Sequence, residues 1–329
     1  MKAMVYTEYG SPDVLELKEI KKPAPKDNEV VVKVHASSVN AADWHHLRGE
    51  PFLFRLSAGF PRPKINILGA DIAGRVETVG KLVKTFQPGD EVFGDLSGIG
   101  FGGFAEYVRI PETVLALKPS NLSFEEAAAV PVAAVTALQG LRDKGQVQPG
   151  QRVLINGASG GVGTFAVQIA KSFGAEVTAV TSTRNLDRAR WIGADHVIDY
   201  TQEDFTQNGQ RYHLILAANG YHPISKYKRA LTSGGIYVMT GGSMAQMFEA
   251  NLLGPWMSIT GSKKMMGLAA KPNKRDLSFI RELLEAGSVI PVIDRCYPFH
   301  EVHEAFRYFE EGHSRGKVVI TVQQNNSAS

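Results

Sequence analysis

The segment that most constrains this chain is residues 153–163, VLINGASGGVG. A short apolar run leads into Gly157, Gly160 and Gly163, and apolar residues at helical spacing follow over 165–173. A strand, a glycine turn and a helix in this order allow a tight turn, a close backbone approach to a pyrophosphate, and dense helix packing. The helix N-terminus adds free N–H donors. A glycine turn without a ligand is the alternative, but the setting favours a nucleotide site, with these candidate residues: Gly157, Ser159, Gly160, Gly161, Val162 and Gly163.

The composition is that of an ordinary globular protein. Hydrophobic residues make up 43% of the 329 positions and charged residues 21%, which is enough for two domains with cores of their own. The net charge of +3 comes without a long basic run, so electrostatics give no argument for nucleic acid. The single cysteine, Cys296, excludes an internal disulfide and a multi-cysteine zinc site. The most apolar helical stretch, 127–138, is short and is broken by Pro131, so we expect no membrane span and a cytoplasmic protein.

The pattern changes along the chain. Residues 1 to about 120 are rich in strand signals and predict a small barrel or sandwich, interrupted at 40–66 by what we interpret as a long irregular loop. Ser123 and Glu126 form a capping box that opens a helix at the domain boundary. Strands are then expected at 152–156, 176–181, 196–199, 214–218 and 236–240, with crossover helices at 161–173, 185–192 and 224–231. This alternation predicts an α/β fold with a doubly wound parallel sheet.

The end of the second expected strand indicates which nicotinamide cofactor is bound. In the NAD form of this fold, an acidic residue about 20 residues after the glycines holds the ribose 2′-hydroxyl. Here that place holds Ser182, Thr183 and Arg184, which can bind a 2′-phosphate through hydrogen bonds and charge. Capping of the next helix is the simpler reading of the Ser and Thr. We predict NADP (NADPH), with Tyr200, at the end of the third strand, covering the adenine or the 2′-phosphate unless it is a core aromatic.

Several longer motifs, taken in order, resemble the medium-chain dehydrogenase/reductase superfamily in its zinc-independent quinone oxidoreductase-like branch. The resemblance covers almost the whole chain. It rests on residues 34–43 (VHASSVNAAD), 68–74 (LGADIAG), 89–94 (GDEVFG), 103–107 (GFAEY), 153–163, 193–200 (GADHVIDY) and 312–317 (GHSRGK).

The resemblance implies a split architecture. A GroES-like catalytic domain would comprise residues 1–123 and 267–329, and a Rossmann NADP-binding domain, 124–266, would be inserted into it, with the active site in the cleft. Homologues commonly dimerise, so a homodimer is expected, with residues 256–262 as the pairing strand. Zinc-dependent relatives carry Cys where this chain has Asn40, and Gly-His-Glu where it has Gly69, Ala70 and Asp71. No metal site is therefore expected, because catalytic zinc needs three protein ligands.

Further site residues follow from the resemblance, each with a simpler alternative. Asn40 is the expected catalytic residue, as an amide contact or oxyanion donor, unless it is only a turn asparagine. Thr136 would bind the nicotinamide carboxamide, or it would bond back to its own helix. Asn219 and Gly241 follow the fourth and fifth strands on the ligand side, where ordinary turn chemistry is the alternative. Arg315 resembles a position near the cofactor, and helix C-capping is its alternative.

Without a Lewis acid, hydride transfer suits acceptors that delocalise the added charge onto oxygen. The predicted activity is NADPH-dependent reduction of a quinone or α,β-unsaturated carbonyl. A zinc-free reductase of alkenals or enoyl thioesters and a non-enzymatic NADPH-binding protein are the alternatives.

Overall fold

The computed structural model describes residues 1–242, 246, 249–254, 258 and 262–322. Its contacts divide the chain into two compact units. The first, here the β-rich unit, comprises residues 1–132, 272–285 and those from 291 onward. The second, the parallel-sheet unit, comprises residues 133–271 and 286–290. The second unit thus interrupts the first in sequence.

The β-rich unit is built around the long strand β3 (Glu29–Val39). It pairs antiparallel with β4 (Asp71–Val79), β6 (Tyr107–Pro111) and β15 (Lys317–Thr321). The main path through this sheet is β14-β15-β3-β4-β5-β7, where β5 is Glu91–Asp95, β7 is Leu115–Leu117 and β14 is Ile293–Pro298. Apolar side chains of β3 such as Val30, Val32 and Val34 are fully buried on one face, as the period of two predicts. Strands β1 (Lys2–Val5) and β2 (Glu16–Glu19) form a separate hairpin.

The prediction of an irregular loop at 40–66 is wrong for the first part of this segment, which forms helix α1 (Ala41–Arg48). Asn40 is the N-cap, and the Asp43 carboxylate accepts a hydrogen bond from its backbone N–H at 2.9 Å. The two residues stand three apart, the spacing of a capping box, which the sequence interpretation overlooked. A short helix, α2 (Arg55–Ala58), follows. Glu310 anchors α1 by accepting from Arg48 and from the Trp44 indole, so a contact distant in sequence fixes this segment.

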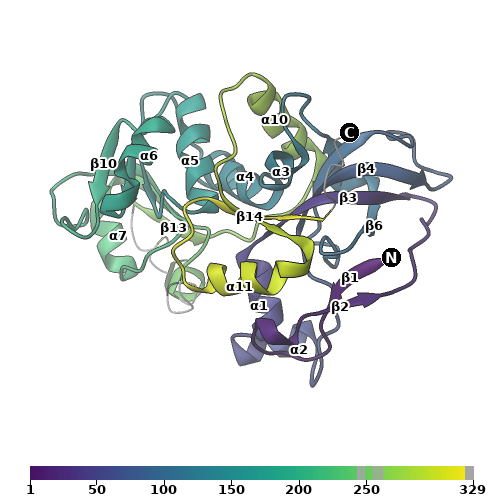
Figure 1. The fold of residues 1–329 in the computed structure, drawn as a ribbon. Coiled ribbons are helices and arrows are strands. Elements are labelled where there is room, and N and C mark those ends of the chain that lie inside the picture. Colours follow the sequence, from purple (N-terminus) through teal and green to yellow (C-terminus); the bar gives the residue numbers. More distant parts are fainter. Residues whose placement is uncertain (243–245, 247–248, 255–257, 259–261, 323–329) are drawn as a thin grey trace. The chain divides into compact units, whose positions relative to one another are not determined.

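The remaining helices of the β-rich unit lie near the domain boundary and toward the C-terminus. Helix α3 (Phe124–Ala128) begins at the Ser123–Glu126 capping box, which is confirmed by reciprocal hydrogen bonds. Helix α10 is Lys274–Glu285, and α11 is Val302–Glu310 and packs beside β14 (Figure 1). Short 3-10 turns of this unit are η1 (Pro12–Val14), η2 (Phe52–Phe54), η3 (Glu112–Val114) and η7 (Phe299–Glu301). A further 3-10 turn, η5 (Thr183–Asn185), lies in the parallel-sheet unit.

The parallel-sheet unit confirms the doubly wound sheet. Its strand order is β10-β9-β8-β11-β12-β13, and all neighbours are parallel. The chain therefore starts in the middle of the sheet and reverses direction there, the arrangement of a Rossmann fold. The strands are β8 (Arg152–Asn156), β9 (Glu176–Thr181), β10 (His196–Asp199), β11 (Tyr212–Ala217), β12 (Leu231–Met239) and β13 (Lys264–Gly267).

Helices connect these strands close to the predicted places. They are α5 (Gly161–Ser172), α6 (Leu186–Trp191) and α7 (Ile224–Ala230), with α5 and α6 packed against β8 to β10 (Figure 1). Helix α4 (Pro131–Leu138) starts at the proline that separates it from α3 and continues into the π-helical turn η4 (Gln139–Lys144). A second π-helical turn, η6, is Glu249–Leu253. The expected pairing strand at 256–262 lies mostly outside the described residues. Among the described helices, none is long and apolar enough to cross a membrane.

Candidate active site

The glycine turn closes β8 as predicted, and each glycine has a different role. Gly157 has a φ of +83°, and a Cβ there would lie 2.7 Å from the backbone nitrogen of Asn219. A Cβ on Gly163 would lie 2.1 Å from the carbonyl oxygen of Gly157, so helix α5 packs directly on the turn. A Cβ on Gly160 would meet nothing nearer than 3.8 Å. The turn is therefore closed against the protein at two glycines and open at the third, which is the N-cap of α5.

This open turn fits a pyrophosphate. The first N–H groups of α5, from Gly161, Val162 and Gly163, have no acceptor within the helix by geometry, and Gly160 supplies no capping side chain. Ser159 lies half-buried beside them. Donors of this kind at a helix N-terminus, next to a glycine that leaves the backbone accessible, suit two phosphate groups.

The carboxyl ends of the parallel strands bring most of the other predicted cofactor residues to the same edge of the sheet. The register aligns Asn156 with Val180 and Ala217, Asp199 with Thr181, and Ala217 with Met239. Gly157, Ser182, Tyr200, Asn219 and Gly241 follow directly after or close to these positions. The backbone N–H of Asn219 donates to Asn156, and that of Gly241 donates to Ala217, so both residues belong to this edge.

The end of β9 carries an acidic neighbour that the sequence interpretation missed. Ser182 is half-buried, and Thr183 and Arg184 are exposed, as a phosphate site requires. However, the Thr183 hydroxyl donates to the carboxylate of Asp199, at the end of the adjacent strand β10. That hydrogen bond lowers the pKa of Asp199. The end of β9 itself carries no acidic residue, as the sequence indicates, but the carboxylate of Asp199 lies beside it on the next strand. The residue could have been found, since Asp199 ends the strand expected to pair with β9. Tyr200 is 61% exposed and is no core aromatic.

Two predicted cofactor residues lie elsewhere in the fold. Thr136 is 8% exposed, inside α4 of the parallel-sheet unit. Arg315 belongs to the β-rich unit, in the turn before β15, where its backbone N–H donates to Asp294 at 2.8 Å. Their predicted roles stay predictions.

Asn40, the expected catalytic residue, is 7% exposed within a buried polar cluster of the β-rich unit. Its amide nitrogen donates to the carboxylate of Asp71 at 2.9 Å and to the carbonyl of Ser38 at 3.3 Å. Its amide oxygen accepts from the ammonium of Lys317, which also donates to Asp71 at 3.1 Å. Asp71 further accepts from the Ser38 hydroxyl and from the backbone N–H of Val132. Both N–H groups of the Asn40 amide therefore have acceptors within the unit, and only the bond to Ser38 is long.

Two more carboxyl groups are buried around this cluster. Burial raises the pKa of Asp43 to about 7, and its oxygens accept from the backbone N–H groups of Asn40 and Gly69. Burial, followed by the charge of Asp71 on the adjoining strand, raises the pKa of Asp95 to about 6. The charge of Lys317 lowers both values. Asp43 is thus a buried hydrogen-bond acceptor.

The described residues offer no cluster of metal ligands. In the described part of the chain, no three or more His, Cys, Asp or Glu residues are grouped so as to hold a metal ion. Asn40 supplies an amide where the zinc-dependent pattern has a thiolate, and Ala70 supplies no ligand atom.

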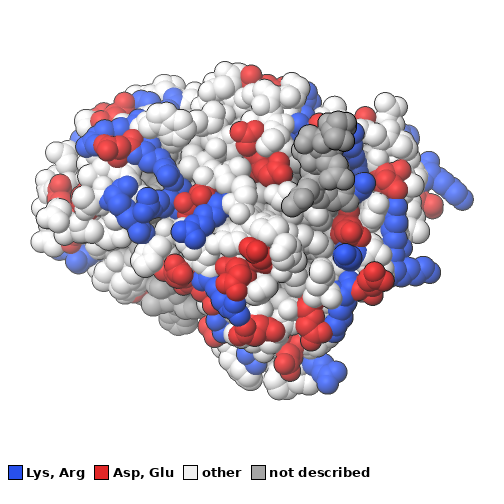
Figure 2. All heavy atoms as spheres, viewed as in Figure 1, with Lys and Arg blue, Asp and Glu red and all other residues white. Residues whose placement is uncertain are grey.

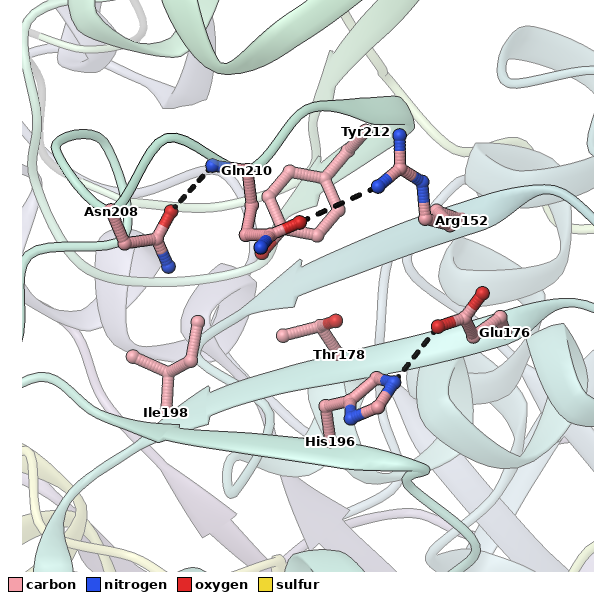
Figure 3. Close-up of a pocket in the computed structure, with 8 residues that line it drawn as sticks. All are labelled: Arg152, Glu176, Thr178, His196, Ile198, Asn208, Gln210 and Tyr212. Atoms are coloured by element: carbon pink, nitrogen blue, oxygen red, sulfur yellow. Dashed lines mark hydrogen bonds and ion pairs between the residues drawn. The ribbon is translucent and has the colours of Figure 1, made fainter.

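A pocket of about 340 Å³ in the parallel-sheet unit lies at the opposite end of the strands (Figure 3). Arg152, Glu176 and His196 each begin a strand and line it, and the imidazole of His196 contacts Glu176 at 2.8 Å. Nucleotides bind at the carboxyl ends of such strands, so this pocket is separate from the edge that carries the glycine turn. On the face shown in Figure 2, basic and acidic side chains are intermixed.

Comparison with known proteins identifies the family. Residues 26–120 match the family described as "Alcohol dehydrogenase GroES-like domain", and residues 192–320 match "Zinc-binding dehydrogenase". A 2-methylene-furan-3-one reductase from Solanum lycopersicum is 36% identical over 97% of this chain and 79% of its own. A chloroplast envelope quinone oxidoreductase homolog from Arabidopsis thaliana is 35% identical over 97% of this chain and 98% of its own. The chain belongs to the medium-chain dehydrogenase/reductase superfamily.

The solved structures agree with this assignment. The quinone oxidoreductase from Coxiella burnetii superposes with a TM-score of 0.87 at 30% identity, covering 98% of this chain and 99% of its own. A structure named NAD-dependent alcohol dehydrogenase gives 0.85 at 32% identity, covering 98% and 100%. The predicted resemblance, the GroES-like and Rossmann fold, and the assignment as an oxidoreductase are confirmed. One similar protein is named for NADPH and one similar structure for NAD. The comparisons therefore support a nicotinamide cofactor but do not choose between NAD and NADP.

Proposed function

We propose that the protein is a zinc-independent, NADPH-dependent reductase of quinones or α,β-unsaturated carbonyls. The observation that carries the proposal is the edge of the parallel sheet, where an open glycine turn adjoins the exposed Thr183 and Arg184. The substrate class is supported by the relatives, which are named for quinones, for alkenals and alkenones, and for a methylene-furanone. All three classes place a carbonyl oxygen in conjugation with the carbon that accepts hydride.

The choice of NADPH rests on Arg184. A 2′-phosphate at the end of β9 would receive the charge of this guanidinium and hydrogen bonds from Ser182 and the backbone. Asp199 opposes it, because its carboxylate lies one strand away and holds the Thr183 hydroxyl. Arg184 is exposed in the turn between β9 and α6. We therefore propose NADPH as the preferred cofactor, with Asp199 reducing the preference over NADH.

The nicotinamide would supply the hydride, and the chain would supply binding and orientation. We propose that Gly157, Ser159, Gly160, Gly161, Val162 and Gly163 hold the pyrophosphate, and that Tyr200, Asn219, Gly241, Thr136 and Arg315 complete the cofactor site. Asn40 is proposed to face the reacting carbonyl. Its long bond to the Ser38 carbonyl is the one that a substrate oxygen would replace. A fixed donor at that oxygen stabilises the charge that develops during hydride transfer.

The decisive experiment is a screen of the purified chain against 1,4-benzoquinone, methyl vinyl ketone, 2-hexenal and crotonyl-CoA, with NADPH and with NADH. The proposal expects turnover on a quinone or an enone, faster with NADPH. Turnover confined to crotonyl-CoA would favour an enoyl-thioester reductase. NADPH binding without turnover on any acceptor would favour the non-enzymatic alternative.

Three further points stay proposals. We propose the domain limits 1–123 with 267–329, and 124–266, for the GroES-like and Rossmann domains. We propose a homodimer, whose test is the mass in solution by light scattering. We also propose a cytoplasmic location, although several relatives are named as chloroplastic or mitochondrial.

A further inference from the structure

The polar cluster around Asn40 contains a buried lysine whose charge none of the predicted roles uses. Lys317 is 3% exposed, at the start of β15. Its ammonium donates to the Asn40 amide oxygen and to the carboxylate of Asp71, which is itself fully buried. Burying an ammonium costs free energy unless it is paired and hydrogen-bonded, so the contacts with Asn40 and Asp71 are what allow Lys317 to be buried here.

The contacts of the Asn40 amide make its orientation depend on Lys317. The two ends of an amide have nearly the same shape, so its partners decide which end points where. An ammonium only donates, and an ionised carboxylate only accepts. The ammonium of Lys317 therefore fixes the oxygen of Asn40, and an oxygen of Asp71 fixes its nitrogen.

The charge of Lys317 also keeps this arrangement from inverting. Asp71 lies opposite Asp95 on the adjoining strand, and its charge raises the pKa of both Asp43 and Asp95. Three carboxyl groups thus compete for negative charge in one buried region, and Lys317 is the cation that offsets them. Without it, protonation of one of these groups is favoured. Loss of the ammonium would also leave the Asn40 oxygen without this donor, and the amide could then turn over.

We propose that Lys317 is a positioning residue that orients the Asn40 amide by fixing its oxygen. This inference rests on the proposed function, in which the nitrogen of that amide donates to the substrate oxygen. The ammonium also polarises the amide, which strengthens its N–H groups as donors. It places a fixed positive charge beside Asn40 and Asp71, two positions at which this chain departs from the zinc-dependent pattern.

The first test compares Lys317→Met, Lys317→Arg and a matched control. The side chain of Lys118, in the β-rich unit, is 5% exposed, and its ammonium is ion-paired with Glu91 at 3.2 Å, so Lys118→Met removes a lysine charge away from Asn40. We expect Lys317→Met to lower kcat for an enone by about 100-fold, the loss typical of removing one oxyanion donor. The Kd for NADPH should stay unchanged, and Lys317→Arg should restore much of the rate. Equal losses in the two Met variants would overturn the proposal.

The second test separates positioning from stability. The double variant Lys317→Met with Asp71→Asn removes both members of the buried ion pair, so that no uncompensated charge is left. If Lys317 only neutralises Asp71, this variant should recover kcat. If it orients Asn40, the variant should melt close to the wild type and remain slow. Recovery of kcat would refute the orienting role.

A third measurement does not need turnover. The side-chain ¹⁵N–¹H signals of Asn40, assigned with Asn40→Ser, should be sharp and well dispersed in the wild type and should shift or broaden in Lys317→Met. Unchanged Asn40 signals in Lys317→Met would overturn the inference. If the wild type reduces no acceptor, the proposed function fails, but this measurement still decides whether Lys317 orients the amide.

Discussion

Replacing Asp43 by Asn tests the buried carboxyl at the start of α1. Its folded-state pKa is raised from 3.8 to about 7, chiefly by burial. A carboxyl with a raised folded pKa favours the folded state fully below pH 3.8, and this contribution is lost as pH rises through 7. At about 1.4 kcal/mol per pKa unit, the whole titration is worth about 4 kcal/mol. Of this, about 3 kcal/mol falls between pH 5 and pH 8.

The free energy of unfolding should be measured in urea at several values between pH 5 and pH 8. Fluorescence is a suitable signal, because Trp44 follows Asp43 directly and its indole donates to Glu310 at 2.8 Å. As pH rises from 5 to 8, the free energy of unfolding of Asp43→Asn should increase by about 3 kcal/mol relative to that of the wild type. It also loses an acceptor for a backbone N–H, but that loss is a constant offset.

Asp13 provides a control, because its pKa is shifted in the opposite direction to that of Asp43. It is exposed, and hydrogen bonds from Ser11 and Arg307 lower its pKa below 3.8. It is therefore ionised in both the folded and the unfolded state above pH 5, so Asp13→Asn should differ from the wild type by the same amount throughout. If the difference between Asp43→Asn and the wild type is just as constant, the raised pKa of Asp43 is refuted.

Three further predictions concern the cofactor site and the metal. Gly163→Ala should lower the melting temperature, because the new methyl would lie 2.1 Å from the carbonyl oxygen of Gly157. Gly160→Ala should melt like the wild type and bind NADPH more weakly. Equal melting temperatures of the two variants would contradict the assigned roles. Arg184→Ala should weaken NADPH binding much more than NADH binding, and Asp199→Asn should strengthen NADPH binding, both by titration calorimetry; equal changes for the two cofactors would contradict the 2′-phosphate assignment. Chelators such as EDTA should leave the activity unchanged, and a loss that zinc restores would overturn the metal-free mechanism.

Much of the parallel-sheet unit could be predicted because its signals are local. Strands β8 and β9 begin and end where they were expected, since buried parallel strands are continuous apolar runs bounded by turn residues. The glycine turn was predicted because its three glycines act within a few residues of each other. The N-terminal half of the predicted loop at 40–66 was misjudged because the Asn40–Asp43 capping box was overlooked and because Glu310, far along the chain, anchors the helix.

The sequence by itself determined the Rossmann turn, the family and the replacement of zinc ligands by Asn40 and Ala70, because each of these depends on residue type at a fixed spacing. Only the tertiary structure showed that Asp199 lies beside Thr183 and that Lys317 reaches Asn40 and Asp71. The physical reason is that strand pairing joins residues far apart in the chain. The register of a sheet decides which carboxyl, amide and ammonium groups share one buried space, and with it their charge and orientation.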